Sequence, residues 1–399
     1  MKNITYVLIA ATLAISCQDT KKQESQSETT PIYVRMANSE MKRNPDPRLI
    51  DFREKPKWEY TNGLLCLAIL KVYQETGDEK YLDYVKYYAD SMILETGKIL
   101  TYKMSDFNID RINPGRFLIR LNEESPNPKY QMAIDSLRKQ MKGHPRTSEG
   151  GFWHKKVYPQ QMWLDGLYMG SPFLTMCAID YSEPRLLDDV ANQFYLIDKN
   201  LYVPEMGLYK HGWDESRAQR WANKETGRSP HFWGRAMGWH AMAIVDVLGE
   251  FPADHPKRPQ LIETANRVAE GITKYQDPET GLWWQVLDKP NEENNYLEAS
   301  CSSMFTYFLL NGVKQGVLDV SYLDVAKKAY NGILNNFIEE NTDGTISLTN
   351  ICAVAGLGGN PYRDGSYDYY VNEPQRDNDP KGVGPFIMAS LLMSEMTEK

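Results

Sequence analysis

Residues 60–92 read YTNGLLCLAILKVYQETGDEKYLDYVKYYADSM, and this stretch decides the fold. Residues 60–73 are mostly apolar, with the spacing of a helix that is buried on nearly every side. Gly77 can end this helix in the left-handed conformation, and Asp78 can cap a second, amphipathic helix over residues 79–92. The stretch therefore predicts a helical hairpin.

The same pairing recurs along the chain, while strand-like alternation is scarce, so the sequence predicts the all-α class. Apolar helices are expected near Tyr60–Tyr73, Asn113–Leu121, Ser171–Tyr181, Ala236–Phe251, Leu297–Val317 and Gly384–Met396. Amphipathic partners are expected near Glu79–Met92, Lys129–Met141, Pro184–Lys199, Pro259–Tyr275 and Tyr322–Phe337, and residues 32–43 can supply the twelfth helix.

Six apolar and six amphipathic helices in alternation indicate a closed ring, in which an outer layer covers an inner one. An open α-solenoid is the alternative, although the pattern has no fixed repeat length. Inner-to-outer links are brief, as at Ser182-Glu183, whereas outer-to-inner links are long and carry most of the Trp, His and Gly. All the long links then meet where the inner helices begin, and helix N-termini suit a ligand with a carboxylate.

The composition of the chain limits the classes of molecule that can bind to it. The net charge of −8 argues against a basic surface that binds nucleic acid, and an anionic substrate needs local cations. Four cysteines, Cys66, Cys177, Cys301 and Cys352, stand among apolar or small residues without a CxxC pair. Buried free thiols are therefore expected in preference to a disulfide or a metal site.

The first residues predict an extracytoplasmic protein. Lys2 precedes an apolar run over residues 7–15 that is too short to span a membrane, so residues 1–17 read as a signal peptide. Small residues before Cys17 indicate that this cysteine carries lipid on a bacterial membrane, facing the periplasm or the outside; an ordinary signal peptide with an incidental cysteine is the alternative. Residues 18–31 are expected to form a flexible tether, and residues 32–399 a catalytic domain.

Asp165 is the first candidate for chemistry. It stands among Trp163, Tyr168 and Met169. In such an apolar setting a carboxylic acid can hold its proton near neutrality, as a general acid requires. A helix cap or a loop carboxylate bonded to backbone N–H groups is the structural alternative.

Asp110 is the second candidate carboxylate. Pro114 suits the first position of a helix, so Asn113 is expected to be its cap and Asp110 to lie free on the rim. Pairing of Asp110 with Arg111 or another nearby base is the alternative.

Aromatic, basic and histidine side chains gather in the same long links. Trp233 and Trp239 can offer flat faces to sugar rings, and Arg235 can offer a fork to a carboxylate. Each could instead be structural, because Trp often fills cores and Arg often caps helix ends. His154 and His211 lack a metal-ligand spacing, so hydrogen bonding to a sugar is the favoured role.

These motifs together resemble the family 105 glycoside hydrolases, the unsaturated rhamnogalacturonyl hydrolases, and more distantly the unsaturated glucuronyl hydrolases of family 88. The resemblance rests on the segments 163–169, 211–213, 233–239 and 296–300, which occur in the expected order. Ala236-Met237 departs from the commoner Gly-Asn, which concerns the subsites and the exact substrate.

The resemblance implies an (α/α)6 barrel of six helical hairpins and hydration of a C4=C5 double bond in an unsaturated uronate. Asp165 would protonate C4 and assist the attack of water at C5, and Asp110 would be the second active-site Asp. His154, Trp163, His211, Trp233, Arg235 and Trp239 would bind the substrate, an oligosaccharide in which rhamnose follows the uronate. No metal or organic cofactor is implied.

Two other functions fit the same residues. An inverting glycosidase would use Asp110 and Asp165 as a base and acid roughly 6.5–9.5 Å apart on a saturated substrate. A non-catalytic glycan-binding lipoprotein would use the Trp-rich rim without consuming its ligand.

Overall fold

The computed structural model describes residues 30–397, so the predicted signal peptide, Cys17 and nearly all of the tether lie outside the described residues. Helices dominate this part of the chain, as the sequence predicts. None of the helices described there is both long and apolar enough to cross a membrane. Cys66, Cys177, Cys301 and Cys352 are buried free thiols, which confirms that prediction.

Twelve of the described helices form the expected hairpins. The apolar members are α3 (Tyr60–Thr76), α5 (Gly115–Glu124), α7 (Leu164–Asp180), α9 (Gly234–Glu250), α11 (Ala299–Lys314) and α14 (Pro380–Thr397). Their amphipathic partners are α2 (Ile32–Arg43), α4 (Glu79–Met92), α6 (Pro128–Lys142), α8 (Arg185–Leu201), α10 (Arg258–Lys274) and α12 (Tyr322–Asn336). A short further helix, α13 (Tyr367–Val371), lies in the last long link.

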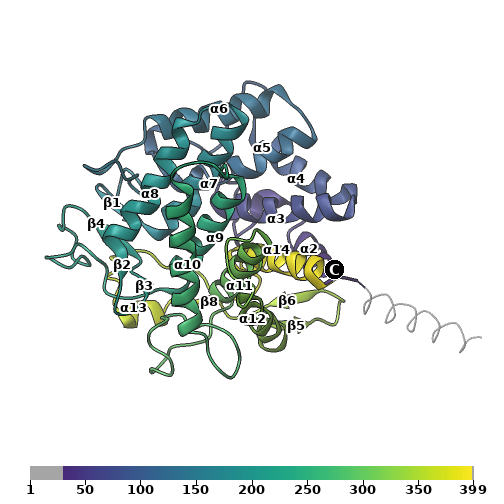
Figure 1. Ribbon diagram of the computed structural model, residues 1–399. Coiled ribbons are helices and arrows are strands. Elements are labelled where there is room, and N and C mark those ends of the chain that lie inside the picture. The colour runs from purple at the N-terminus through teal and green to yellow at the C-terminus, as the bar shows by residue number, and fades with distance from the viewer. Residues whose placement is uncertain (1–29, 398–399) are drawn as a thin grey trace, which may run out of the picture.

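The apolar helices form a closed inner ring. Each packs against the next, from α3 through α5, α7, α9 and α11 to α14, and α14 packs back against α3. In Figure 1, α7, α9, α11 and the yellow α14 lie toward the middle, while α6, α8, α10 and α12 lie around them. Every residue from Thr61 to Leu70 of α3 is buried, as an inner helix requires. The (α/α)6 barrel is therefore confirmed, and the open solenoid is excluded.

The link lengths also follow the prediction. Residues 77–78, 125–127 and 181–184 join inner to outer helices, whereas residues 143–163, 202–233 and 275–298 lead back to inner helices. The long links hold short antiparallel strands that pair two by two: β1 (Gln161–Trp163) with β4 (Gly212–Asp214), β2 (Tyr202–Val203) with β3 (Leu208–Tyr209), β5 (Ile338–Glu340) with β6 (Ile346–Leu348), and β7 (Ile351–Cys352) with β8 (Gln375–Arg376). They lie at the mouth where the inner helices begin.

The start of α7 differs from the prediction. The helix begins at Leu164 rather than near Ser171, because tertiary packing overrides the weak helical preference of Gly166, Gly170 and Pro172. Asp165 therefore lies in the first turn of an inner helix rather than in the link before it.

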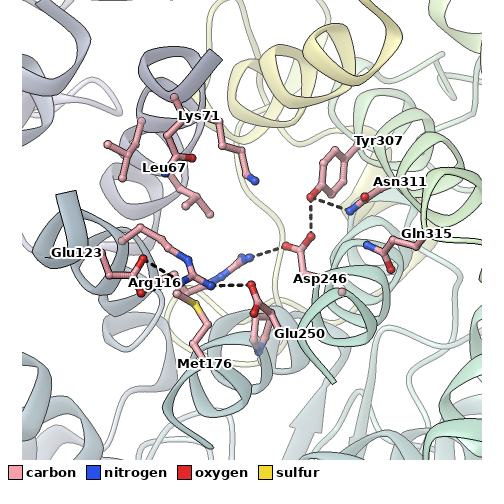
Figure 2. A pocket seen from close by; sticks show the side chains of 15 residues that line it. Leu67, Lys71, Arg116, Glu123, Met176, Asp246, Glu250, Tyr307, Asn311 and Gln315 are labelled. Carbon is pink, nitrogen blue, oxygen red and sulfur yellow. Dashed lines mark hydrogen bonds and ion pairs between the residues drawn. The ribbon is translucent and has the colours of Figure 1, made fainter. Parts of the chain in front are cut away.

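The opposite mouth, where the inner helices end, contains a polar hollow of about 410 Å³ (Figure 2). Arg116 of α5 and Asp246 of α9 form an ion pair of 2.6 Å there, with side chains only 8% and 6% exposed. The Tyr307 hydroxyl donates a second hydrogen bond of 2.6 Å to Asp246. This network ties three inner helices together, and Figure 2 shows it below the amine of Lys71.

Breaking this network is predicted to destabilise the fold. Asp246→Ala leaves the Arg116 guanidinium buried without its partner, so the free energy of unfolding should fall by about 3–5 kcal/mol. Urea-induced unfolding followed by circular dichroism measures the change. Glu123→Ala, which removes a half-exposed partner of Arg120, is the matched control and should cost less than about 1 kcal/mol. Equal losses from both substitutions would contradict the prediction.

Candidate active site

Asp165 and His211 face each other at the mouth where the inner helices begin. Asp165 Oδ2 lies 3.2 Å from His211 Nε2, and the two side chains are 13% and 0% exposed. Neither atom has an aligned hydrogen-bond partner among the described residues, although both are buried. Buried polar atoms without partners are costly, which makes this pair a candidate for binding a group that enters the site.

Backbone pairing between two long links brings these residues together. In the β1–β4 ribbon Trp163 pairs with Gly212, and the Leu164 amide donates to the His211 carbonyl at 3.0 Å. A Cβ atom at Gly212 would lie 2.9 Å from the Trp163 ring, so this close approach requires glycine. This pairing fixes His211 beside the first turn of α7, although His211 and Asp165 are 46 positions apart in the sequence.

A tyrosine from the last long link orients the His211 ring. His211 Nδ1 and the Tyr370 hydroxyl form a hydrogen bond of 2.8 Å between two fully buried side chains. Burial raises the pKa of Tyr370 well above its usual value, so its hydroxyl keeps its proton. If this hydroxyl donates to Nδ1, the His211 proton resides on Nε2, which faces Asp165.

Asp110 is paired rather than free. Lys155 Nζ lies 2.6 Å from Asp110 Oδ2, and His154 Nε2 lies 3.3 Å from Oδ1. Burial opposes the charge on Lys155, but the Asp110 carboxylate outweighs it and raises the pKa of the amine. The expectation of a free Asp110 is therefore wrong, because the link with Lys155 pairs with residues 108–109 through backbone hydrogen bonds.

The helix cap predicted beside Asp110 is also different. Pro114 occupies the N-cap position of α5, without a side-chain hydrogen bond to the helix. The amide of Asn113 instead donates to the Tyr168 carbonyl, at 3.5 Å. Asn108 serves as the local cap, since its side chain accepts from the Asp110 amide at 3.0 Å. A hydrogen bond from its backbone amide and the contacts of its side chain with Lys155 and His154 thus hold Asp110 in place.

The His154 side chain lies close both to Asp110 and to the turn that carries Asp165. Its ring stacks on Trp163 at a centroid distance of 4.4 Å, and its Nδ1 is buried without a partner. A Cβ atom at Gly166 would lie 3.4 Å from Nδ1, so the ring reaches the turn that carries Asp165. Burial, aided by the positive charge of Lys155, lowers the pKa of His154 well below its usual value. The imidazole is therefore neutral and contacts Asp110 as a hydrogen-bonding group.

The three candidate tryptophans differ in their surroundings. Trp163 lies between His154 and Tyr158, with the Tyr158 ring stacked at 5.1 Å. Trp233 lies 4.8 Å from the His211 ring and donates from its indole nitrogen to Gln285 at 3.1 Å. Trp239 is deeper in the barrel and only 2% exposed, stacked on Tyr168 at 4.8 Å. The Tyr60 ring packs against it in a T-shaped arrangement, at a centroid distance of 6.1 Å.

Arg235 is buried at the start of α9 and is held by protein groups. Its Nη1 donates to the Ser300 hydroxyl at 3.2 Å, and its Nη2 donates to the Cys352 carbonyl. Glu298, the cap of α11, accepts from the amides of Cys301 and Cys352 at 2.8 and 2.9 Å and from Ser300 at 2.7 Å. Two nitrogens of the Arg235 guanidinium, which was predicted to bind a carboxylate, thus already donate to protein groups.

Several residues of this site escaped the sequence reasoning. Lys155 adjoins His154, and this neighbour could have drawn attention to it as the partner of a carboxylate. Tyr370 and Glu298 gave no comparable signal, because their partners lie far away in sequence. Among residues 30–397, no three His, Cys, Asp or Glu side chains gather as metal ligands would.

Comparison with protein families places this chain in a known group. The model of glycosyl hydrolase family 88 matches residues 32–397. Among curated proteins, the Agrobacterium fabrum protein Atu3128 is 42% identical over 235 residues, which are 57% of this chain and all of that protein. A Bacillus subtilis protein named unsaturated rhamnogalacturonyl hydrolase YesR is 26% identical over 296 residues, 73% of this chain and 78% of that one.

Solved structures agree with this grouping. A family 105 glycoside hydrolase from C. acetobutylicum ATCC 824 superposes with a TM-score of 0.88 at 45% identity, covering 92% of this chain and all of the other. A possible family 105 member from Klebsiella pneumoniae superposes at 0.72 with 27% identity, covering 86% and 85% of the two chains. The chain is therefore a glycoside hydrolase that belongs to family 88 as that model defines it, and to family 105 by its likeness to the C. acetobutylicum enzyme.

Proposed function

We propose that this enzyme removes the unsaturated uronic acid from oligosaccharides that polysaccharide lyases produce, by hydrating its C4=C5 double bond. The observation that most supports this is the pair of buried atoms without aligned partners, Asp165 Oδ2 and His211 Nε2, 3.2 Å apart. One carboxyl group with one oriented imidazole suits a proton transfer to carbon followed by activation of water. The name of the Bacillus relative supports the same class of substrate.

The reaction consumes one water molecule. Asp165 donates its proton to C4, and its carboxylate then takes a proton from the water that adds to C5. The resulting hemiketal opens to a ketone at C5, and the hemiacetal left at C1 releases the neighbouring sugar. His211 faces the Asp165 carboxyl at 3.2 Å and is itself oriented by Tyr370.

The other predicted residues bind the sugar in this proposal. Asp110, the second active-site carboxylate, accepts hydrogen bonds from hydroxyl groups while Lys155 fixes its position. His154, Trp163, His211, Trp233 and Trp239 surround the uronate and its neighbour, and the buried charge of Arg235 attracts the uronate carboxylate. By resemblance, the neighbouring sugar is rhamnose and the parent polymer is of the rhamnogalacturonan type.

Asp165→Asn is predicted to remove activity without unfolding the protein. Loss of a proton-transfer group costs roughly 10²- to 10⁴-fold in rate. The assay follows loss of the enoate ultraviolet absorbance with lyase-generated disaccharides from pectin, glycosaminoglycan and ulvan-type polymers. Asp180→Asn changes an exposed carboxylate at the far end of α7 and should retain full activity.

The same assay separates the alternatives. An inverting glycosidase would cleave saturated oligosaccharides, and a glycan-binding protein would leave the absorbance unchanged. Failure of the wild-type enzyme on every unsaturated disaccharide would overturn the proposal.

Tyr370→Phe tests the orientation of His211. The substitution removes the hydroxyl bonded to Nδ1, whose net worth of about 0.5–1.5 kcal/mol corresponds to roughly a 2- to 13-fold fall in kcat with KM nearly unchanged. Tyr367→Phe is the matched control, because its hydroxyl donates to the carbonyl of the exposed Glu293. An equal effect of both changes, or a change in KM alone, would argue against the orienting role.

We also propose that the enzyme is lipid-anchored through Cys17 to a bacterial membrane, on the periplasmic side or the cell surface. The short apolar run and the small residues before Cys17 support this location. Cys17→Ser should move the protein from the membrane fraction to the soluble fraction and abolish labelling by radioactive fatty acid. Unchanged fractionation and labelling would contradict the anchor.

A further inference from the structure

A second cavity adjoins the chain segment that carries His211. Its volume is about 680 Å³, and it is lined by Lys210, by Asp364 and Ser366, and by side chains from residues 220–231. Figure 1 shows the strands of this region, β2, β3 and β4, gathered with α13 on one side of the barrel. We call it the basic rim cavity.

Three cations line the basic rim cavity; Asp364 interacts electrostatically with Arg220, and Asp288 with Lys210, beyond ion-pair distance. The Arg220 guanidinium lies 3.7 Å from the centre of the Tyr362 ring, and Arg228 donates from Nε to the Asn200 carbonyl at 2.6 Å. Lys210 donates to the Pro230 carbonyl at 2.6 Å. In the part of the chain that the structure describes, none of the three has a carboxylate within the ion-pair distance of 4.0 Å.

The side chains that line the cavity carry a net positive charge, whereas the whole chain carries a net negative charge. Asp364 is the one carboxylate that lines the cavity, and it accepts from the Ser366 amide at 2.9 Å. Three cations therefore exceed the acidic charge by two, on a chain with a net charge of −8. Burial lowers the pKa of Lys210 to about 8, so this amine still carries most of its charge at pH 7.

The basic rim cavity adjoins the candidate active site but does not share its reacting groups. Lys210 and His211 are neighbours whose side chains take opposite directions, toward the cavity and toward Asp165. Ser229, another lining residue, accepts from the Gly212 amide at 3.1 Å. Trp221 lines the cavity and also packs in one cluster with Trp163. A ligand longer than a disaccharide could pass over this rim.

We infer that the basic rim cavity is a second glycan-binding site, which holds the carboxylates of longer acidic oligosaccharides. Guanidinium groups bind carboxylates through paired hydrogen bonds, and the volume falls in the range of small-ligand sites. The inference rests on the proposed function, because that function makes uronate-rich fragments the natural ligands. Its role is to retain such fragments near the catalytic mouth.

Binding is tested on the Asp165→Asn enzyme, so that no turnover interferes. Calorimetry with saturated galacturonate oligosaccharides at low ionic strength should show binding that weakens as salt is added. The double variant R220Q/R228Q should bind at least about tenfold more weakly, since charged hydrogen bonds contribute about 1.5–3 kcal/mol each. The control K257Q/K327Q removes two exposed cations elsewhere and should bind as the parent does.

Four results would overturn the inference, three of them from the binding experiment with these variants. They are no binding of galacturonate oligosaccharides, equal weakening by both double variants, and binding restricted to sulfated glycans. Equal affinity for neutral oligosaccharides of the same length would do so as well, because the cations would then have no role.

Kinetics separates this inference from the proposed function. With active enzyme, R220Q/R228Q should raise KM several-fold for long unsaturated oligosaccharides and leave kcat/KM for the disaccharide unchanged. An equal loss on both substrates would indicate structural damage and refute the second site. Absence of disaccharide turnover by the wild type would refute the proposed function while leaving the binding result readable.

Discussion

Closure of the inner helical ring is the constraint on which the rest of this structure depends. Helices such as α3 are apolar on all sides, so each needs neighbours in every direction. The contact of α14 with α3 completes the ring, and the outer helices cover it. Because inner and outer helices alternate in direction, all inner helices begin at one mouth. The positive ends of six helix dipoles therefore meet where the long links lie.

The two mouths of the barrel have different polar chemistry. At the mouth with the polar hollow, Arg116, Asp246 and Tyr307 tie three inner helices together, while Arg116 Nε and Nη1 have no aligned partner among the described residues. At the open end, Asp165 and His211 face each other with atoms that have no aligned partner. The ion pair between helices gives the first mouth a role in stability, and in the proposed function the second mouth carries the chemistry.

Asp110 and Asp165, at the mouth where the inner helices begin, have different surroundings. Asp110 is held by Lys155 and His154, whereas Asp165 sits in the first turn of α7 next to a single oriented imidazole. Different surroundings of this kind are how a site divides roles between chemically identical groups. In the proposed mechanism Asp165 moves the protons, and Asp110 binds the sugar. In the further inference, the segment with Lys210 and His211 borders two sites, with His211 facing Asp165 and Lys210 lining the basic rim cavity.

The sequence by itself determined the helical class, the six hairpins and the mouth where the long links meet, because apolar periodicity and link length are local signals. It also singled out Asp165 and the aromatic segments around it. Only the tertiary structure decided that Asp110 pairs with Lys155, that α7 begins at Leu164, and that Tyr370 orients His211. Those outcomes depend on links that meet across the rim, and contacts between residues so far apart leave no periodic trace in the chain.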